Sequence, residues 1–427
     1  MNILILGSGG REHVYADMLG KSILCDKLFV APGNAGTSDV AENIDMQVTD
    51  FEKIASFCLS NKIEMLIPGG EDALVAGIYD YFEADEKLKH IKVIGPSKAG
   101  AMLEGSKDFS KAFMQRHGVP TAAYATFNSS NAETGKSFLK TLKPPYVLKA
   151  DGLAAGKGVL IIEDLKEAES ALDEMLLNKK FGAASSKVVI EEYLHGIELS
   201  VFVLTDGTSY KILPAAKDYK RIGEGDTGLN TGGMGAISPV PFANEEFIKK
   251  VEDRVVKPTI AGLKAENITY KGIIFIGLMN VDGNPQVIEY NVRMGDPETE
   301  VVFPRIETDL GELLWATGIG KLSETELKIS DKTAATVFMV SGGYPEAFEK
   351  GYEITGLDNV TGSKVYHAGT TLKDGKTVTN GGRILAITSL GNTIDEAVKT
   401  SFMNCDKIQY TNKYFRKDIG KDLTQHG

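Results

Sequence analysis

The sequence predicts a multidomain protein of mixed α/β and α+β class. We expect an N-terminal parallel α/β domain, a two-part middle domain and a small C-terminal α+β domain. The chain has 427 residues, and roughly 150 residues per domain suggest about three domains. In the first hundred residues, short apolar runs alternate with helix-length segments, which is typical of βαβ units. From about residue 327, a second group of strands and one amphipathic helix follows.

The composition limits the partners of this protein. Lys+Arg 47 against Asp+Glu 58 gives a net charge of −11, so no basic field is available for nucleic acid or an anionic membrane. An anionic substrate must therefore be bound by individual cationic side chains and backbone amides within its site. Cys25, Cys58 and Cys405 lie far apart without CxxC spacing, which favours reduced thiols in a cytoplasmic protein. The N-terminal apolar run is too short for a signal peptide, and no later segment is long enough to span a bilayer.

The expected N-terminal strands, residues 2–6, 28–31, 65–67 and 91–94, each lead into a loop rich in glycine or proline. Loops at the carboxyl ends of parallel strands bind ligands in such sheets. In the first loop, Glu12 stands where a dinucleotide fingerprint has its third glycine, and the second strand ends at Pro32 instead of a ribose-binding acid. A nicotinamide or flavin role is therefore disfavoured. Gly9 and Gly10 are better placed as amide donors to a single phosphate, with a plain strand-to-helix turn as the alternative.

The middle domain is expected to begin near residues 100–122, where a charged helical segment runs into Gly118 and Pro120. A glycine-rich hairpin then spans residues 146–162. It is not a P-loop, because Asp151 and Gly158 occupy the positions of the required glycine and Ser or Thr. An ordinary hairpin is the alternative to one that covers phosphates. The predicted domains are residues 1–102, 103–326 and 327–427, with a lid subdomain at about 122–189.

The strand at residues 187–192 ends in two acids, Glu191 and Glu192, followed by an aromatic and an aliphatic residue. An adenine ring needs an apolar slot with a backbone donor and acceptor, and the end of such a strand can supply both. The next strand, residues 196–203, opens with Glu198, whose carboxylate suits ribose hydroxyls. Taken singly, each of these elements is also compatible with a purely structural role.

The densest polar segment is residues 289–298, directly after a hydrophobic strand. Alternate residues of a strand share a face, so Glu289, Asn291 and Arg293 are expected to project into one cleft. Two oxygen ligands beside a guanidinium suit a metal-bound polyphosphate. The alternative is a solvated polar strand face that leads into a turn.

The order of these elements resembles the ATP-grasp superfamily: a lysine strand, a glycine loop, a Glu-Glu hinge, an acidic strand and then Glu-x-Asn. Within it, residues 217–239 are similar to the signature of the phosphoribosylamine-glycine ligase family. The resemblance runs from residue 1 to about 420. It departs from the family's common pattern at residues 70–74, Tyr219, Leu229 and Glu300. Further matching segments are residues 7–13, 31–37, 103–107, 149–158, 293–299 and 415–420.

The resemblance implies an ATP-dependent ligase of purine biosynthesis. Such an enzyme joins glycine to 5-phosphoribosylamine through glycyl phosphate and releases ADP and phosphate. It also implies Mg²⁺ or Mn²⁺ as cofactor, and a cytoplasmic protein that is expected to be a monomer with small-molecule partners only. The alternatives are another ATP-grasp carboxylate-amine ligase, a nicotinamide oxidoreductase, and an inactive nucleotide-binding protein. The last would be expected to lose Glu289, Asn291 or Arg293, and all three are present.

The resemblance also implies roles for individual residues. Glu289 and Asn291 would hold the metal, and Arg293 would stabilise the transferring phosphoryl group. Glu300, charged where glutamine is frequent, would lie beside the glycine pocket. The residues implied for ATP are Lys107, Lys149, Gly156, Lys157, Gly158, Glu191, Glu192, Tyr193, Leu194 and Glu198. Those implied for glycine and the sugar phosphate are Gly9, Gly10, Asn34, Gly36, Thr37, Glu71, Asp218, Lys220, Asn230, Gly232, Gly233, Asp296 and Glu298.

The C-terminal unit is expected to contain strands at residues 334–340, 364–368 and 383–388, and a helix at 393–403 that Thr393 caps. His367 in this unit is a candidate general base, but a structural role is the better interpretation. His13, after the first glycine loop, is the better functional candidate.

Overall fold

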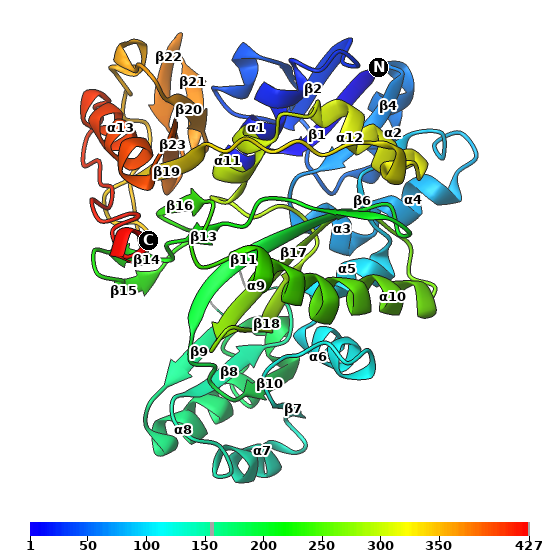
Figure 1. The fold of residues 1–427 in the computed structure, drawn as a ribbon, viewed down its shortest axis with the longest axis vertical. Helices are drawn as coiled ribbons and strands as arrows, with labels where there is room; N and C mark the ends of the chain where they lie inside the picture. The colour runs from blue at the N-terminus through cyan, green and yellow to red at the C-terminus, as the bar shows by residue number, and fades with distance from the viewer. Residues whose placement is uncertain (154–157, 426–427) are drawn as a thin grey trace.

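The computed structural model describes residues 1–153 and 158–425. Its N-terminal part is a sheet of five parallel strands in the order β3-β2-β1-β4-β5 (Figure 1). The four strands expected here are confirmed, and a short strand, β3, joins them. The strands are β1 Asn2–Gly7, β2 Lys27–Pro32, β3 Glu42–Asn43, β4 Ile63–Pro68 and β5 Lys92–Val93, and the helices are α1 Gly10–Leu19, α2 Phe51–Ser60, α3 Glu71–Ala76 and α4 Ile78–Ala84.

Two helices lead from this sheet into a small antiparallel sheet with strand order β7-β10-β8-β9. The predicted hairpin is confirmed as β8 and β9, although its tip at residues 154–157 lies outside the described residues. Two helices cover one face of this sheet and bury a separate apolar core. The elements are α5 Lys98–Gly105, α6 Lys107–Arg116, β7 Tyr124–Asn128, α7 Ala132–Leu139, β8 Tyr146–Ala150, β9 Val159–Ile162, α8 Leu165–Leu176 and β10 Lys187–Glu191.

The larger sheet of the middle region has the order β12-β11-β17-β18, with β6 paired to the start of β17. Its long central strands cross the middle of the molecule between the small sheet and the N-terminal sheet (Figure 1). Its elements are β6 Gly95–Pro96, β11 Ile197–Thr205, β12 Tyr210–Ile212, α9 Glu245–Val251, the π-helical turn Glu252–Val256, α10 Lys257–Ala265, β17 Tyr270–Val281 and β18 Asn284–Asn291.

The C-terminal sheet has the order β13-β16-β19-β23-β20. Two of its strands, β13 and β16, come from residues 217–238, within the range that the sequence assigns to the middle domain. The expected C-terminal strands and helix are confirmed, and the Thr393 side chain accepts a hydrogen bond from the Glu396 amide as the cap of α13. The elements are β13 Lys217–Asp218, β14 Arg221–Gly223, β15 Thr227–Asn230, β16 Gly235–Ser238, α11 Thr299–Val302, α12 Leu310–Ile319, β19 Thr333–Val340, β20 Lys364–His367, β21 Thr370–Lys373, β22 Lys376–Thr379, β23 Arg383–Gly391 and α13 Ile394–Lys407.

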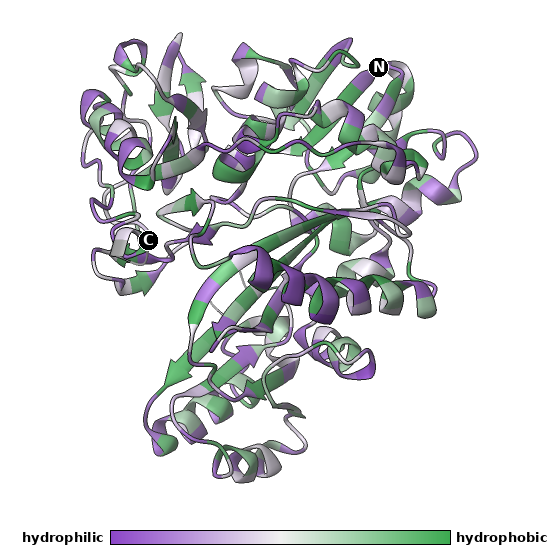
Figure 2. Cartoon of the chain, in the orientation of Figure 1, coloured by the Kyte–Doolittle hydropathy of each residue, from purple (hydrophilic) through white to green (hydrophobic). Residues whose placement is uncertain are grey.

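The strands of the N-terminal sheet are largely hydrophobic (Figure 2), and the two faces of the sheet pack in two different cores that include residues of the other sheets. Alternate residues of β1 enter two different cores. Ile3 and Ile5 pack in the core that includes Phe338 of the C-terminal sheet. Leu4 and Leu6, on the opposite face, pack in the core that includes Tyr290 of β18. Two continuous cores therefore fix the N-terminal loops relative to β18. Within the described residues, no helix is long and apolar enough to cross a membrane.

Candidate active site

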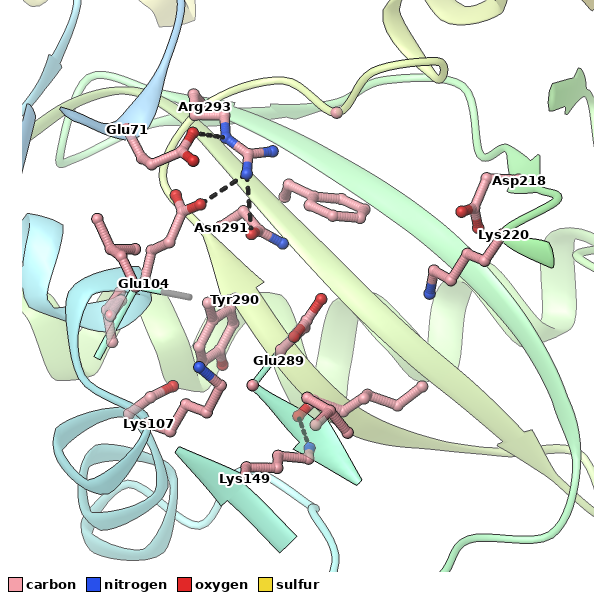
Figure 3. A pocket seen from close by; sticks show the side chains of 18 of the residues that line it. Glu71, Glu104, Lys107, Lys149, Asp218, Lys220, Glu289, Tyr290, Asn291 and Arg293 are labelled. Carbon is pink, nitrogen blue, oxygen red and sulfur yellow. Dashed lines mark hydrogen bonds and ion pairs between the residues drawn. The ribbon is translucent and has the colours of Figure 1, made fainter. Parts of the chain in front are cut away.

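A cavity of about 270 Å³ lies where the small sheet, the end of β18, helices α5 and α6, and the segment around β13 meet (Figure 3). Segments that are far apart in the sequence each contribute polar side chains to it. The predicted site residues that line this cavity are Glu71, Lys107, Lys149, Gly158, Glu191, Asp218, Lys220, Gly232, Glu289, Asn291, Arg293, Asp296 and Glu298.

A β-bulge turns the end of β18 toward this cavity. Gly277 of β17 is opposite Glu289, while the next residue of β17 is opposite Val287, so Ile288 is the extra residue of a bulge. Strict alternation would place Glu289 on the same face as Val287, which is buried in the core. After the bulge Tyr290 faces the core instead, and Glu289 and Asn291 line the cavity. The predicted shared face of Glu289 and Asn291 is therefore confirmed, through a shift in register.

Glu289 is surrounded by cations (Figure 3). Burial favours its neutral form, but Lys220, Lys149, Lys107 and Arg293 outweigh burial and hold its pKa below the ordinary value. The group is therefore a carboxylate at neutral pH.

The donor set at the end of β18 fits a metal that arrives with phosphates. Glu289 and Asn291 offer two hard oxygen ligands to the cavity. Among the residues described by the structure, no group of three or more His, Cys, Asp or Glu side chains is arranged to hold a metal ion. An ion at Glu289 would therefore take its other ligands from phosphate and water, as suits Mg²⁺, which dehydrates reluctantly.

Arg293 is held by two carboxylates from different elements (Figure 3). Its Nε donates to Glu71 Oε2 at 3.1 Å, and its Nη2 donates to Glu104 Oε1 at 2.7 Å. Nη2 also lies 3.3 Å from Asn291 Oδ1. The sequence predictions did not include Glu104 as a site residue, although it belongs to the segment 103–107 that carries the family resemblance. Its second oxygen accepts the Val292 amide at 2.8 Å, so it fixes both the backbone and the guanidinium at the end of β18.

The lysines of the small sheet and α6 meet a buried glutamate. Lys149 Nζ lies 3.0 Å from Glu191 Oε1, and Lys111 Nζ lies 2.8 Å from Glu191 Oε2. All three side chains are buried. Lys111 was not predicted from the sequence. Lys107 begins α6, and burial lowers its pKa although Glu289 opposes that shift. Lys107 and Lys149 both lie near Glu289 and line the cavity, so their ammonium groups form a positively charged surface that can bind a polyphosphate.

A second acidic group lies on the far side of Glu289. Glu298 is buried and accepts a hydrogen bond from Ser200 Oγ at 3.2 Å. Burial, together with the nearby Asp218 charge, raises the pKa of Glu298 to about 8. Lys220 lies between Asp218 and Glu289 and pairs with Glu198. Glu198 thus faces a lysine and is not part of the cavity lining.

Asp296, next to the acidic group of Glu298 and Asp218, contacts the start of α1, after the first loop of the N-terminal sheet, and the C-terminal sheet. Its Oδ1 lies 2.9 Å from Arg383 Nη2, and its Oδ2 accepts the amide of Arg11 at 3.4 Å. Arg383 comes from the C-terminal sheet and was not among the predicted site residues. Glu300 is fully buried close to Gly10, where a Cβ at that glycine would lie 2.4 Å from its Oε1. Burial and the Asp296 charge raise the pKa of Glu300 well above its ordinary value.

The raised pKa of Glu298 predicts a specific pH dependence of stability. The unfolded group titrates near 4.5 and the folded group near 8, so between these values the native state binds more protons than the unfolded state. Stability from this group is thus complete below pH 4.5 and is lost as the pH rises through 8. We expect Glu298→Gln to reduce the drop in melting temperature between pH 6 and pH 8.5, as measured by circular dichroism. An identical drop in both proteins would contradict this assignment.

The other predicted residues either fall outside the described residues or lie outside the lining of the cavity. Gly156 and Lys157 fall outside the described residues. Glu192 is exposed, and its backbone amide donates to the Ala123 carbonyl at 2.9 Å, which continues the pairing of β10 with β7 by one residue. The Gly9 amide donates to Glu12 Oε2 at 2.6 Å. The remaining predicted residues outside the lining are Gly10, Asn34, Gly36, Thr37, Tyr193, Leu194, Glu198, Asn230 and Gly233.

The Asn34 loop is stabilised by its own side chains. Asn34 Oδ1 accepts the amides of Gly36 and Thr37 at 2.9 and 3.0 Å. Its Nδ2 donates to the His367 carbonyl at 2.7 Å. These groups are buried and already paired within the protein. A direct side-chain contact of Asn34 with a sugar phosphate therefore stays a prediction without support from this geometry.

The histidine pair also belongs to the scaffold. His13 Nδ1 accepts the backbone amide of His367 at 2.8 Å, and His367 Nδ1 lies 3.0 Å from Thr370 Oγ1. Burial lowers the pKa of both rings, to about 3 for His13 and about 4 for His367. Both rings are thus neutral at physiological pH. The structure gives His13 a role in joining α1 to β20, outside the cavity.

Three family models match this chain in succession. The N domain of phosphoribosylglycinamide synthetase matches residues 1–104, its ATP-grasp (A) domain matches residues 105–299, and its C domain matches residues 334–422. The chain is 44% identical to the phosphoribosylamine-glycine ligase of Pasteurella multocida over 424 residues, which cover 98% of this chain and 97% of the relative. It is 43% identical to that of Caldanaerobacter subterraneus, with 98% and 99% coverage.

Solved structures agree with these matches. The crystal structure of a phosphoribosylamine-glycine ligase from Thermotoga maritima has a TM-score of 0.85 and 34% identity, and covers 98% of this chain and 100% of its own. A biotin carboxylase domain from Hydrogenobacter thermophilus, solved with MgADP, shares the fold at a TM-score of 0.69 and 18% identity, with 97% and 91% coverage. With a carboxylate, an amide and a guanidinium gathered in one cavity that two lysines also line, the chain belongs to the phosphoribosylamine-glycine ligase family of ATP-grasp enzymes.

Proposed function

We propose that this protein ligates glycine to 5-phosphoribosylamine with cleavage of ATP to ADP and phosphate, a step of purine biosynthesis. The observation that carries the proposal is the cavity itself. It combines lysine side chains that can bind phosphates, the carboxylate of Glu289 and the amide of Asn291 that can bind a metal, and a second group of acidic side chains suited to an ammonium. Family membership across all three domains supports the same activity.

ATP would bind with its phosphates over Lys107 and Lys149 and its base near Glu191, at the end of β10. Gly158 lines the cavity just after the hairpin tip, and Gly156 and Lys157 are proposed to cover the phosphates from there. A lid of this kind excludes water that would otherwise hydrolyse a reactive intermediate. We assign Tyr193 and Leu194 to the apolar base slot and Glu198 to the ribose.

Glu289 and Asn291 would hold Mg²⁺, or Mn²⁺, through their oxygens. When bound, the ion supplies charge neutralisation at the β- and γ-phosphates. Arg293 donates to oxygens of the transferring phosphoryl group from the same strand end. No protein nucleophile is needed, because phosphoryl transfer depends mainly on positioning and on electrostatic stabilisation.

The chemistry proceeds in two steps. A glycine carboxylate oxygen attacks the γ-phosphorus, and the bond to the β-phosphate oxygen breaks to release ADP. The amine of 5-phosphoribosylamine then attacks the acyl carbon of glycyl phosphate. Phosphate leaves with the electron pair of the acyl C–O bond, and the new amide nitrogen loses one proton. Asp296 and Glu298 would bind the glycine ammonium, whose positive charge would lower the raised pKa of Glu298 and favour its carboxylate form. Asp218 and Lys220 would lie where glycine and the amine meet.

The sugar phosphate is assigned to the side of the cavity that faces the N-terminal sheet. Glu71 lines the cavity there, at the start of α3. Gly9, Gly10 and the loop at residues 34–37 are proposed to surround the phosphate group. Asn230, Gly232 and Gly233 form the turn on the opposite side. We also propose that the protein is a cytoplasmic monomer with the domain limits given above.

The decisive experiment measures ADP release with glycine and 5-phosphoribosylamine omitted in turn. We expect rapid release only when both are present with ATP and Mg²⁺. ADP release that is indifferent to 5-phosphoribosylamine, or that requires a different amine, would refute the assignment and favour another ATP-grasp carboxylate-amine ligase. Mass spectrometry of the product as glycinamide ribonucleotide provides an independent check.

A further inference from the structure

The two carboxylates that hold Arg293 differ in how firmly they are fixed. The Glu104 side chain is 7% exposed, and its two oxygens hold both the Arg293 guanidinium and the Val292 amide. If Glu104 moved away, the buried Val292 amide would lose its hydrogen-bond acceptor, which is unfavourable because a buried donor is then left unsatisfied. Glu104 is therefore a permanent anchor of Arg293.

Glu71 is the less constrained partner. Its side chain is 32% exposed, and it contacts Arg293 through one oxygen, at 3.1 Å from Nε. Although burial opposes ionisation, the Arg293 and Arg11 guanidinium groups hold the pKa of Glu71 below its ordinary value. Glu71 is thus a charged, partly exposed acceptor that can exchange Arg293 for another donor at small cost.

The Glu71–Arg293 contact links two sides of the cavity. Glu71 follows β4 of the N-terminal sheet, and Arg293 follows β18 of the larger sheet (Figure 3). Both residues line the cavity, so a ligand can reach Glu71 without unfolding any element. The amino and hydroxyl groups of a ribosylamine are donors, and a carboxylate only accepts hydrogen bonds. Such a ligand competes directly with Arg293 for Glu71.

Resting on the function proposed above, we propose that Glu71 is a positioning residue that couples the ribosylamine site to Arg293. With that site empty, Glu71 holds the Nε edge of Arg293 away from the transferring phosphoryl group. When the ribosylamine binds, its amino and hydroxyl groups donate hydrogen bonds to Glu71 in place of Arg293. Arg293 stays anchored by Glu104 and turns the released Nε edge of its guanidinium toward the phosphates. Glycine is then phosphorylated mainly when the amine that consumes glycyl phosphate is present.

The test compares two rates of ADP formation: one with ATP and glycine alone, and one with 5-phosphoribosylamine added. For Glu71→Gln, with 5-phosphoribosylamine at saturation, we expect the first rate itself to increase, so that the ratio of the first rate to the second rises roughly tenfold, as for loss of one charge-assisted hydrogen bond. A ratio that rises only because the second rate falls would show loss of amine binding and would overturn the coupling. Glu71→Asp should behave similarly, because its shorter side chain does not reach Nε. The matched control is Asp72→Asn, which removes a charge from the adjacent exposed position and should keep the wild-type ratio.

A purely structural role for Glu71 would lower both rates together and leave their ratio unchanged. An unchanged ratio in both folded Glu71 variants would overturn the coupling while leaving the proposed activity intact. Wild-type ADP formation that does not depend on 5-phosphoribosylamine, with glycinamide ribonucleotide still formed, would also overturn the coupling. By contrast, if the wild-type protein forms no glycinamide ribonucleotide from the three substrates, the proposed function itself fails. A rise in the Asp72→Asn ratio equal to that of Glu71→Gln would also overturn the coupling, since any lost charge would then suffice.

Discussion

Glu289→Ala is expected to lower kcat/KM by at least about 10³-fold, which corresponds to roughly 4 kcal/mol of transition-state stabilisation. The variant loses the carboxylate that four cations surround, and with it the proposed anionic ligand of the metal. The fold should persist, because the core of this strand is built by Val287 and Tyr290 instead. Steady-state ADP release at several Mg²⁺ concentrations measures the effect, and circular dichroism checks the fold.

The control for this variant is Gln286→Ala, on the same strand before the bulge and outside the cavity lining. It should retain near-wild-type activity. Near-normal activity of Glu289→Ala at saturating Mg²⁺ would refute the metal role. Loss of activity accompanied by loss of helical and strand signals would show instead that Glu289 is needed for folding.

Glu104→Ala is expected to destabilise the protein by about 3–5 kcal/mol, the range for breaking a buried ion pair by removing one partner. The change leaves the Arg293 guanidinium with one less carboxylate and leaves the Val292 amide without its acceptor. Activity should fall as well, because the end of β18 loses its anchor. The midpoint of denaturant unfolding, with ADP release on the same samples, measures both effects.

Glu104→Gln provides a graded comparison, since its amide oxygen can still accept one of the two hydrogen bonds. We expect a smaller loss of stability than for alanine. Glu307→Ala, at an exposed position, should change the free energy of unfolding by no more than about 0.5 kcal/mol. Equal stability of Glu104→Ala and Glu307→Ala would show that the buried pair contributes nothing net.

Local patterns predicted most of the architecture. The N-terminal strands, the 146–162 hairpin and the C-terminal helix with its Thr393 cap are confirmed, because each depends on periodicity and capping within a short segment. Strand alternation alone predicted that Glu289 and Arg293 share a cleft, whereas the presence of Lys149 in the same cavity was expected only through the family resemblance. A functional role for His13 stays a prediction, and in the structure its Nδ1 accepts the backbone amide of His367.

Contacts between distant segments explain what local patterns missed. Glu104, Lys111 and Arg383 act through partners 189, 80 and 87 residues away, namely Arg293, Glu191 and the Asp296 carbonyl. No spacing rule within one helix or strand marks such partners. Contact of Asn34 with a ligand stays a prediction, and in the structure its side chain bonds the amides of its own turn and the carbonyl of His367.

By itself, the sequence determined which chemical groups this protein has: a strand that ends in carboxylate, amide and guanidinium, lysines on a hairpin and a helix start, and no basic surface field. The tertiary structure alone decided where those groups point. The bulge at Ile288 reverses the alternation of β18 and turns Glu289 from the core face to the cavity. Two carboxylates from separate elements then set the position of Arg293. The physical reason is that strand register and ion pairing depend on the neighbouring strand and on distant charges, which no short stretch of sequence contains.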